Sequence, residues 1–144
     1  YYPNIDGLMI SGAFSLLDTE IKKSLTTNDV IAGKDLAFAP GMQANISARY
    51  EWDVASGNLG HIQGQLVASD KSFSDIIEPN KAKQDSYSYA NIRAGISNDS
   101  WVAEMYIDNI TDERAEISNN YVFDRQRVAV IRPMTIGLRY KLNF

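Results

Sequence analysis

The sequence predicts an all-β protein, an antiparallel segment of a transmembrane β-barrel. Two observations lead to this prediction. Apolar residues recur at every second position over stretches of about 9–13 residues, which is the length that a tilted strand needs to cross a bilayer. The connections between these stretches alternate between short turns and long polar loops, as they do in outer-membrane barrels.

Three strands are predicted in the N-terminal half, over residues 7–17, 42–52 and 61–69. Each has one apolar and one polar face, because side chains alternate across a strand. The apolar sets are Leu8, Ile10, Phe14 and Leu16; then Met42, Ala44, Ile46, Ala48, Tyr50 and Trp52; then Ile62, Leu66 and Ala68.

Three further strands are predicted over residues 88–97, 101–110 and 134–144, which makes about six in all. The last is the most regular, with apolar residues at every even position from Met134 to Phe144 and small, polar or charged residues between them. A chain end is usually frayed and polar. Here a long alternating strand reaches the final aromatic residue, which favours a barrel over a soluble edge strand.

The connections support the same architecture. Short turns are predicted at residues 53–60 and 98–100, where Ser, Gly, Asn and Asp gather. Long polar connections run over residues 20–40, 70–87 and 111–132, and three structureless loops of this size are unusual in soluble domains. In a barrel, all three would lie on the extracellular side.

Aromatic residues gather at the strand ends that flank the short turns. A barrel would place them at one membrane interface as an aromatic girdle. The simpler interpretation is that they fill the core of a sandwich. The residues are Tyr50, Trp52, Trp101, Tyr140 and Phe144.

Composition excludes several classes of function. The net charge is −4 and no basic stripe occurs, so nucleic acid is not expected as a partner. Cysteine is absent and His61 is the only histidine, so a metal site built on Cys and His is not expected. No cofactor is expected. No catalytic constellation stands out, and we expect no enzyme. His61 is interpreted as a polar lining residue.

Residues 89–96 (YANIRAGI), 101–114 (WVAEMYIDNITDER) and 132–144 (RPMTIGLRYKLNF) resemble the C-terminal end of a TonB-dependent outer-membrane receptor. Residues 16–20 and 38–52 resemble the preceding hairpins of the same family. The resemblance covers nearly the whole chain. Its most specific parts are residues 108–114 and the terminal strand.

The resemblance implies a barrel of about 22 strands with a plugged lumen, of which residues 1–144 would form the C-terminal part. The signal peptide, the plug domain and the TonB-contacting segment would lie upstream, outside this chain. The implied function is TonB-energised uptake of a scarce nutrient, such as a ferric siderophore, cobalamin or a sugar. The implied location is the outer membrane of a Gram-negative bacterium, and the implied partners are its lipid, the plug and the TonB complex.

The last strand also resembles the signal that the barrel assembly machinery reads, with a polar residue, a glycine and spaced apolar residues. An exposed strand edge can be recognised by strand addition. The matching residues are Thr135, Gly137, Tyr140, Leu142 and Phe144.

The loop at 111–132 offers candidate ligand-binding residues, because loops on a rigid scaffold commonly carry binding. A plain solvated loop is the alternative. The candidates combine aromatic, amide and charged groups: Asn119, Asn120, Tyr121, Phe123, Asp124, Arg125 and Arg127.

Two other classes of protein compete with a receptor. A small self-contained outer-membrane barrel, such as an adhesin or a lipid enzyme, would need at least eight strands, more than the sequence predicts. A soluble β-sandwich binding module would show similar alternation but no long–short order of loops.

Overall fold

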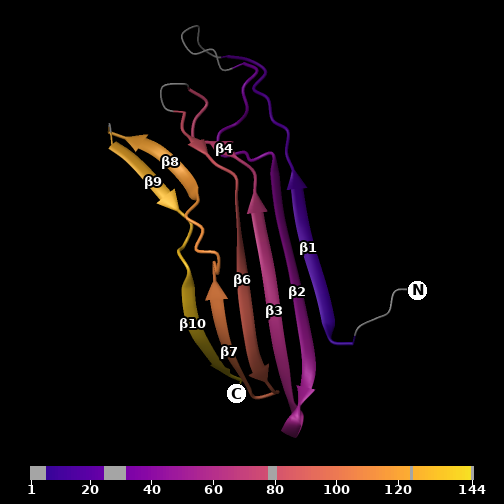
Figure 1. The fold of residues 1–144 in the computed structure, drawn as a ribbon. Coiled ribbons are helices and arrows are strands. Elements are labelled where there is room, and N and C mark those ends of the chain that lie inside the picture. The colour runs from indigo at the N-terminus through magenta and orange to yellow at the C-terminus, as the bar shows by residue number, and fades with distance from the viewer. Residues whose placement is uncertain (1–5, 25–31, 78–80, 124, 144) are drawn as a thin grey trace, which may run out of the picture.

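One antiparallel sheet of six long strands forms most of the molecule (Figure 1). The computed structural model describes residues 6–24, 32–77, 81–123 and 125–143. Each long strand pairs with the next long strand along the chain, so the predicted all-β, antiparallel fold is confirmed. The sheet is open, with β1 and β10 at its edges. Its strands are β1 (Leu8–Leu16), β2 (Met42–Val54), β3 (Asn58–Ser69), β6 (Tyr87–Ser97), β7 (Trp101–Asp108) and β10 (Thr135–Leu142).

The register brings the apolar positions of neighbouring strands opposite one another. One row of directly paired residues crosses all six strands and contains Leu8, Tyr50, Ile62, Ala94, Met105 and Leu138. Opposed residues point to the same side of a sheet, so the alternation of these strands is in phase and gives the sheet one apolar and one polar face.

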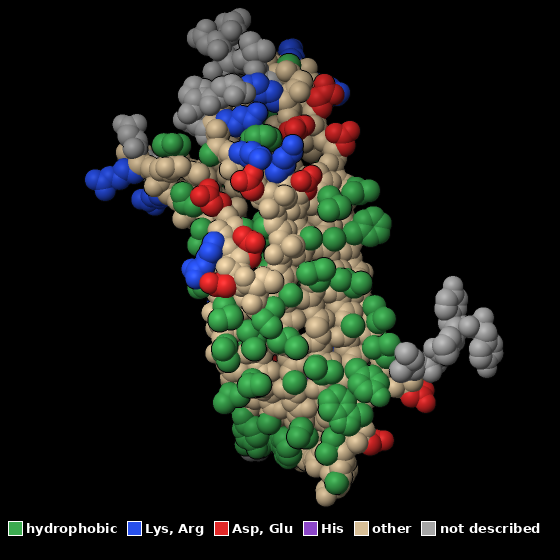
Figure 2. Space-filling model, viewed as in Figure 1, with side chains coloured by type: hydrophobic (Ala, Val, Ile, Leu, Met, Phe, Trp, Pro, Cys, Tyr) green, Lys and Arg blue, Asp and Glu red, His purple; other side chains and the backbone are tan. Residues whose placement is uncertain are grey.

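No other part of the described chain covers the apolar face of the sheet. Leu138 is 83% exposed and Phe14 is 78% exposed. Figure 2 shows apolar side chains spread along the strands, whereas most of the charged side chains of this view gather at the end that carries the long connections. Among the described residues, no helix is long and apolar enough to span a membrane.

The aromatic residues lie on the apolar face near the short turns. Tyr50 stacks on Trp52 with 5.8 Å between ring centroids, and Trp101 stacks on Tyr140 at 6.3 Å. The Trp52 indole also covers Gly60, where an added Cβ would lie 2.6 Å from the ring. The predicted gathering of aromatics at this end is confirmed for these four residues. Phe144 lies outside the described residues.

The first short turn is tighter than predicted. A turn was predicted over residues 53–60, but β2 ends at Val54 and β3 begins at Asn58, so that only the 3₁₀ turn η1 (Ala55–Gly57) separates them. Ser56 and Gly57 reverse the chain in the left-handed region, with φ of 69° and 74°. In the second short turn, the Asn98 side-chain oxygen accepts the backbone N–H groups of Ser100 and Trp101 at 2.9 and 3.0 Å.

The expectation of structureless long connections was wrong for two of the three. Residues 70–87 contain the short pair β4 (Ser72–Phe73) and β5 (Lys83–Gln84), and residues 111–132 contain the hairpin β8 (Glu116–Val122) and β9 (Arg125–Val130). The β8–β9 strands are short and interrupted by a bulge, so their alternation is weak in the sequence. Both pairs lie at the end of the sheet opposite the short turns (Figure 1).

Two glycines test how tightly the sheet is packed. An added Cβ at Gly95 would lie 2.4 Å from the Ala103 carbonyl oxygen and 3.0 Å from Glu104 Cα, both backbone atoms of β7. Gly95→Ala should therefore cost about 1–3 kcal/mol of unfolding free energy. Gly64→Ala, where nothing lies within 4 Å, should change it by less than about 0.5 kcal/mol. Urea unfolding of the full-length protein in vesicles measures both, and equal losses would contradict the packing described.

Candidate functional site

The polar face of the sheet carries a row of ionisable side chains near the short turns. Register places Glu51, His61, Gly95, Glu104 and Arg139 in one line across β2, β3, β6, β7 and β10. Glu51 pairs with the Arg49 guanidinium at 2.7 Å. The two oxygens of Glu104 face His61 Nε2 at 3.2 Å and Arg139 Nη1 at 3.5 Å. The row is thus an alternating chain of acidic and basic groups.

His61 is the most buried side chain of this row, at 2% exposed. It reaches Glu104 across β6 because Gly95 lies between them without a side chain, and a Cβ there would come 2.8 Å from the ring. Within the described residues, His61 Nδ1 has no hydrogen-bond partner. The sequence interpretation of His61 as a lining residue missed this burial and this pairing.

A second polar line runs toward the long connections. Asn91 donates to Gln65 at 2.9 Å, and Gln65 donates in turn to Asn45 at 3.2 Å. Asn91 also accepts the backbone N–H of Asn109 at 2.8 Å. These hydrogen bonds form an amide ladder from Asn45 through Gln65 and Asn91 to Asn109, the first residue after β7.

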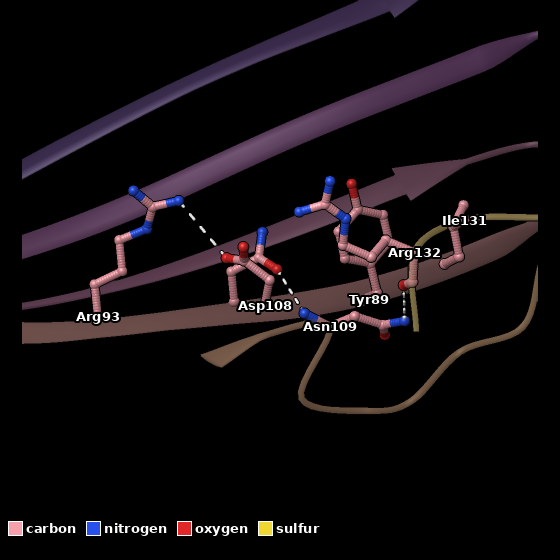
Figure 3. Close-up of a pocket in the computed structure, with 7 residues that line it drawn as sticks. Tyr89, Arg93, Asp108, Asn109, Ile131 and Arg132 are labelled. Carbon is pink, nitrogen blue, oxygen red and sulfur yellow. Dashed lines mark hydrogen bonds and ion pairs between the residues drawn. The ribbon is translucent and has the colours of Figure 1, made fainter. Parts of the chain in front are cut away.

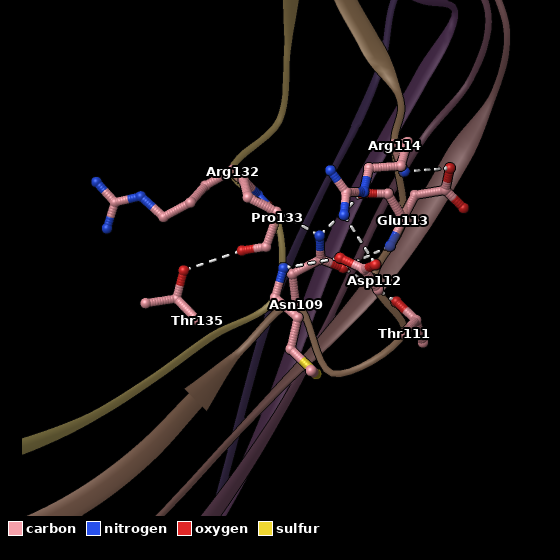
Figure 4. A network of polar contacts seen from close by, with 9 residues as sticks. Asn109, Thr111, Asp112, Glu113, Arg114, Arg132, Pro133 and Thr135 are labelled. Carbon is pink, nitrogen blue, oxygen red and sulfur yellow. Dashed lines mark hydrogen bonds and ion pairs between the residues drawn. The ribbon is translucent and has the colours of Figure 1, made fainter.

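The Asn109 side chain binds both ends of the 111–132 connection and so holds them at the end of β7 (Figure 4). We call this arrangement the Asn109 clamp. The Asn109 amide nitrogen donates to the carbonyl oxygens of Glu113 and Arg132, both at 2.9 Å. Its amide oxygen accepts the Glu113 backbone N–H at 2.9 Å and the Thr111 hydroxyl at 3.2 Å. Asn109 is 3% exposed and has φ of 53°, a conformation that Asn tolerates better than most residues.

Asp112 adds a second tie between the same two ends. Its carboxylate accepts the Met134 backbone N–H at 3.0 Å and the Arg114 guanidinium at 3.0 Å. These two hydrogen bonds hold the pKa of the Asp112 carboxyl below its usual range. Because the pKa is lower in the folded protein, the ionised Asp112 carboxylate stabilises the fold at any pH above the ordinary carboxyl pKa. This stabilisation is lost as the pH falls through the lowered pKa.

Beside this clamp, the polar face is hollowed by a pocket of about 270 Å³ (Figure 3). Its lining comes from β6, from the end of β7 and from the returning leg of the 111–132 connection. Within the lining, the ion pair between Arg93 Nη2 and Asp108 Oδ1 spans 3.6 Å. The lining residues are Tyr89, Asn91, Arg93, Asp108, Asn109, Ile131 and Arg132.

The candidate ligand residues of the loop do not converge on one site. They lie on the β8–β9 hairpin, where register puts Asn119 and Tyr121 on one face and Asn120, Arg125 and Arg127 on the other. Asn119 is 5% exposed and is bound to Glu116 and Gln126. Phe123 is 95% exposed near the tip. Asp124 lies outside the described residues, and the ligand role of this set stays a prediction.

The candidate assembly residues lie on β10, at an edge of the sheet. Thr135 and Gly137 pair with Asp108 and Tyr106 on the polar side, whereas Tyr140 and Leu142 pair with Ala103 and Trp101 on the apolar side. Phe144 lies outside the described residues. Their role in assembly stays a prediction.

Sequence reasoning missed the pocket because its residues lie on three separated segments. The nearest signal was the DNITDER stretch, residues 108–114, singled out as specific without a physical role. Among the described residues, no group of three or more His, Cys, Asp or Glu side chains could hold a metal ion.

Comparison with known proteins shows a likeness in fold. The ferric preacinetobactin receptor BauA from Acinetobacter baumannii matches 95% of this chain with a TM-score of 0.73 and 18% identity. The siderophore receptor PiuA from the same organism also matches 95%, with a TM-score of 0.72 and 19% identity. The chain spans 20% and 19% of the lengths of these two receptors. No protein-family model and no curated protein sequence matches it.

The Asn109 clamp can be tested separately from its backbone conformation. Asn109→Gly keeps a residue that accepts positive φ but removes the buried side-chain hydrogen bonds. It should lower the free energy of opening of residues 111–132 by about 2 kcal/mol or more, a roughly 30-fold faster amide exchange. Asn120→Gly, which loses one exposed bond to Ser118, should cost less than about 1 kcal/mol. Hydrogen exchange of the full-length protein that showed equal effects would contradict the clamp.

Proposed function

We propose that this chain is the C-terminal barrel portion of a TonB-dependent outer-membrane receptor that imports a ferric siderophore. The observation that carries the proposal is the six-stranded sheet with one open apolar face, which is similar to two siderophore receptors over 95% of the chain. Both of these neighbours are siderophore receptors, so we favour this cargo over cobalamin or a sugar. The resemblance of residues 108–114 and 132–144 to the family adds independent support.

In this proposal the apolar face contacts lipid of a Gram-negative outer membrane. Its support is energetic: an apolar surface of this extent, left in water, would be unfavourable and prone to aggregation. The edges β1 and β10 would pair with strands supplied by the rest of the barrel, because unpaired edges expose main-chain hydrogen-bonding groups.

The polar face would line the lumen and face the plug domain. Its support is the row of charged and amide side chains from Arg49 to Arg139, which would be costly against lipid. The plug and the segment that contacts the TonB complex would lie upstream of this chain. In this role the chain binds and conducts a ligand, and no enzymatic step is proposed.

The β10 edge would serve the barrel assembly machinery as a strand-addition signal. It has a polar side with Thr135 and Gly137 and an apolar side with Tyr140 and Leu142. Phe144 would complete the signal. At the opposite end of the sheet, the β8–β9 hairpin would present Phe123 at the cell surface, where an exposed aromatic residue can meet a ligand.

The test is iron uptake by cells that carry the full-length gene. Deleting the gene should abolish uptake of one class of radiolabelled ferric siderophore under iron limitation, and so should collapse of the proton-motive force. Leu138→Arg on the apolar face should cost about 2–4 kcal/mol and lower the receptor level in outer-membrane fractions, whereas Arg139→Gln should not. Uptake that survived gene deletion would refute the proposal. The opposite ranking of the two variants would refute the assignment of faces.

A further inference from the structure

The pocket beside the Asn109 clamp contains groups that the fold already uses and groups that it leaves available. Asn91 and Asn109 have their amides bound within the ladder and the clamp. By contrast, neither the Arg132 guanidinium nor the Tyr89 hydroxyl makes an ion pair or hydrogen bond among the described residues. Only the backbone of Arg132 is fixed, through its carbonyl bond to Asn109. The Arg132 guanidinium therefore lines the pocket without a carboxylate partner among the described residues.

Arg93 makes only a long ion pair with Asp108. Their 3.6 Å separation exceeds a normal hydrogen bond, and the buried Asp108 Oδ1 accepts none within the described residues. Arg93 and Arg132 against Asp108 leave the pocket with a net charge of +1, in a chain whose net charge is −4. Guanidinium groups bind planar anionic oxygens with paired hydrogen bonds, so this excess suits a carboxylate or a catecholate.

Tyr89 gives the pocket one aromatic wall, and its stacking partner Tyr87 lies outside the lining. Tyr87 and Tyr89 stack with 6.3 Å between ring centroids and an interplanar angle of 15°, both on the polar side of β6. A flat ring could extend this stack while its oxygens reach Arg132 and the Tyr89 hydroxyl. The pocket volume of about 270 Å³ falls just below the roughly 300–1,000 Å³ of sites that enclose a whole drug-sized ligand. It therefore suits one arm of a larger molecule.

We propose that this pocket is a subsite for one anionic aromatic arm, of the catecholate or aromatic carboxylate class, of the imported ligand. This inference rests on the proposed receptor function and adds the chemical class of the cargo. Arg132 supplies the main charge, Tyr89 adds a hydroxyl donor and a ring face, and the Asn109 clamp holds Arg132 beside β6.

The test compares two ferric chelates on the purified full-length protein in detergent, where no energised transport is needed. The probes are a synthetic ferric tris-catecholate, which is anionic, and a ferric tris-hydroxamate, which is neutral. Arg132→Gln should weaken catecholate binding about 10- to 100-fold, and Tyr89→Phe about threefold, because they remove a charged and a neutral hydrogen bond respectively. Neither should alter hydroxamate binding. Lys141→Gln removes a charge from the same face at the opposite end and should change neither.

Several results would overturn the subsite. Equal losses for the two chelates, or an unchanged catecholate affinity in Arg132→Gln, would remove the assigned role of charge. If Arg132→Gln lowered the melting temperature and left the catecholate affinity unchanged, Arg132 would instead pair with a carboxylate of the protein itself. A wild-type preference for the neutral chelate would overturn the subsite but leave receptor function standing, since uptake is measured separately. Binding of neither chelate would count against both.

Discussion

The phase of the side-chain alternation across the six long strands is the constraint on which the rest of the structure depends. A slip of one residue between two strands would move every side chain of one strand to the other face. Arg49 and Glu51 would then join the apolar face, and Tyr50 and Trp52 would join the polar face. Register is held by the short turns and by cross-strand contacts on the polar side, such as Ser11 to Ser47 at 2.8 Å and Gln65 to Asn45 at 3.2 Å.

The same register assembles the polar chemistry. His61 and Glu104 are 43 residues apart in the chain, yet they meet because β3 and β7 flank β6 and because Gly95 offers no side chain between them. The pocket arises in a similar way at the other end. The amide ladder positions Asn109, and Asn109 binds both ends of the 111–132 connection, so that Arg132 lines the same pocket as Tyr89 and Arg93.

The sequence predicted what depends on local periodicity. All six long strands, their order along the chain and the end of the sheet that carries the long connections were predicted correctly. Strand ends were less accurate: β2 and β3 run further into the first short turn because Ser56 and Gly57 complete the reversal alone. The β8–β9 hairpin was missed because two short strands with a bulge carry little periodic signal. The clamp and the pocket could not be predicted, because they depend on pairing between distant residues such as Asn109 and Arg132.

The central claim is that the apolar face of the sheet meets lipid, and β10 tests it most directly. This chain contains no cysteine. With any cysteines elsewhere in the full-length protein replaced by serine, a single cysteine at each position from 136 to 141 can carry a nitroxide label. In the full-length protein in bilayers, labels at 136, 138 and 140 should be accessible to oxygen, which partitions into lipid. Labels at 137, 139 and 141 should respond to a water-soluble nickel chelate instead. A period of two in this order is the predicted result, whereas uniform access of the nickel chelate or the inverted order would contradict the account.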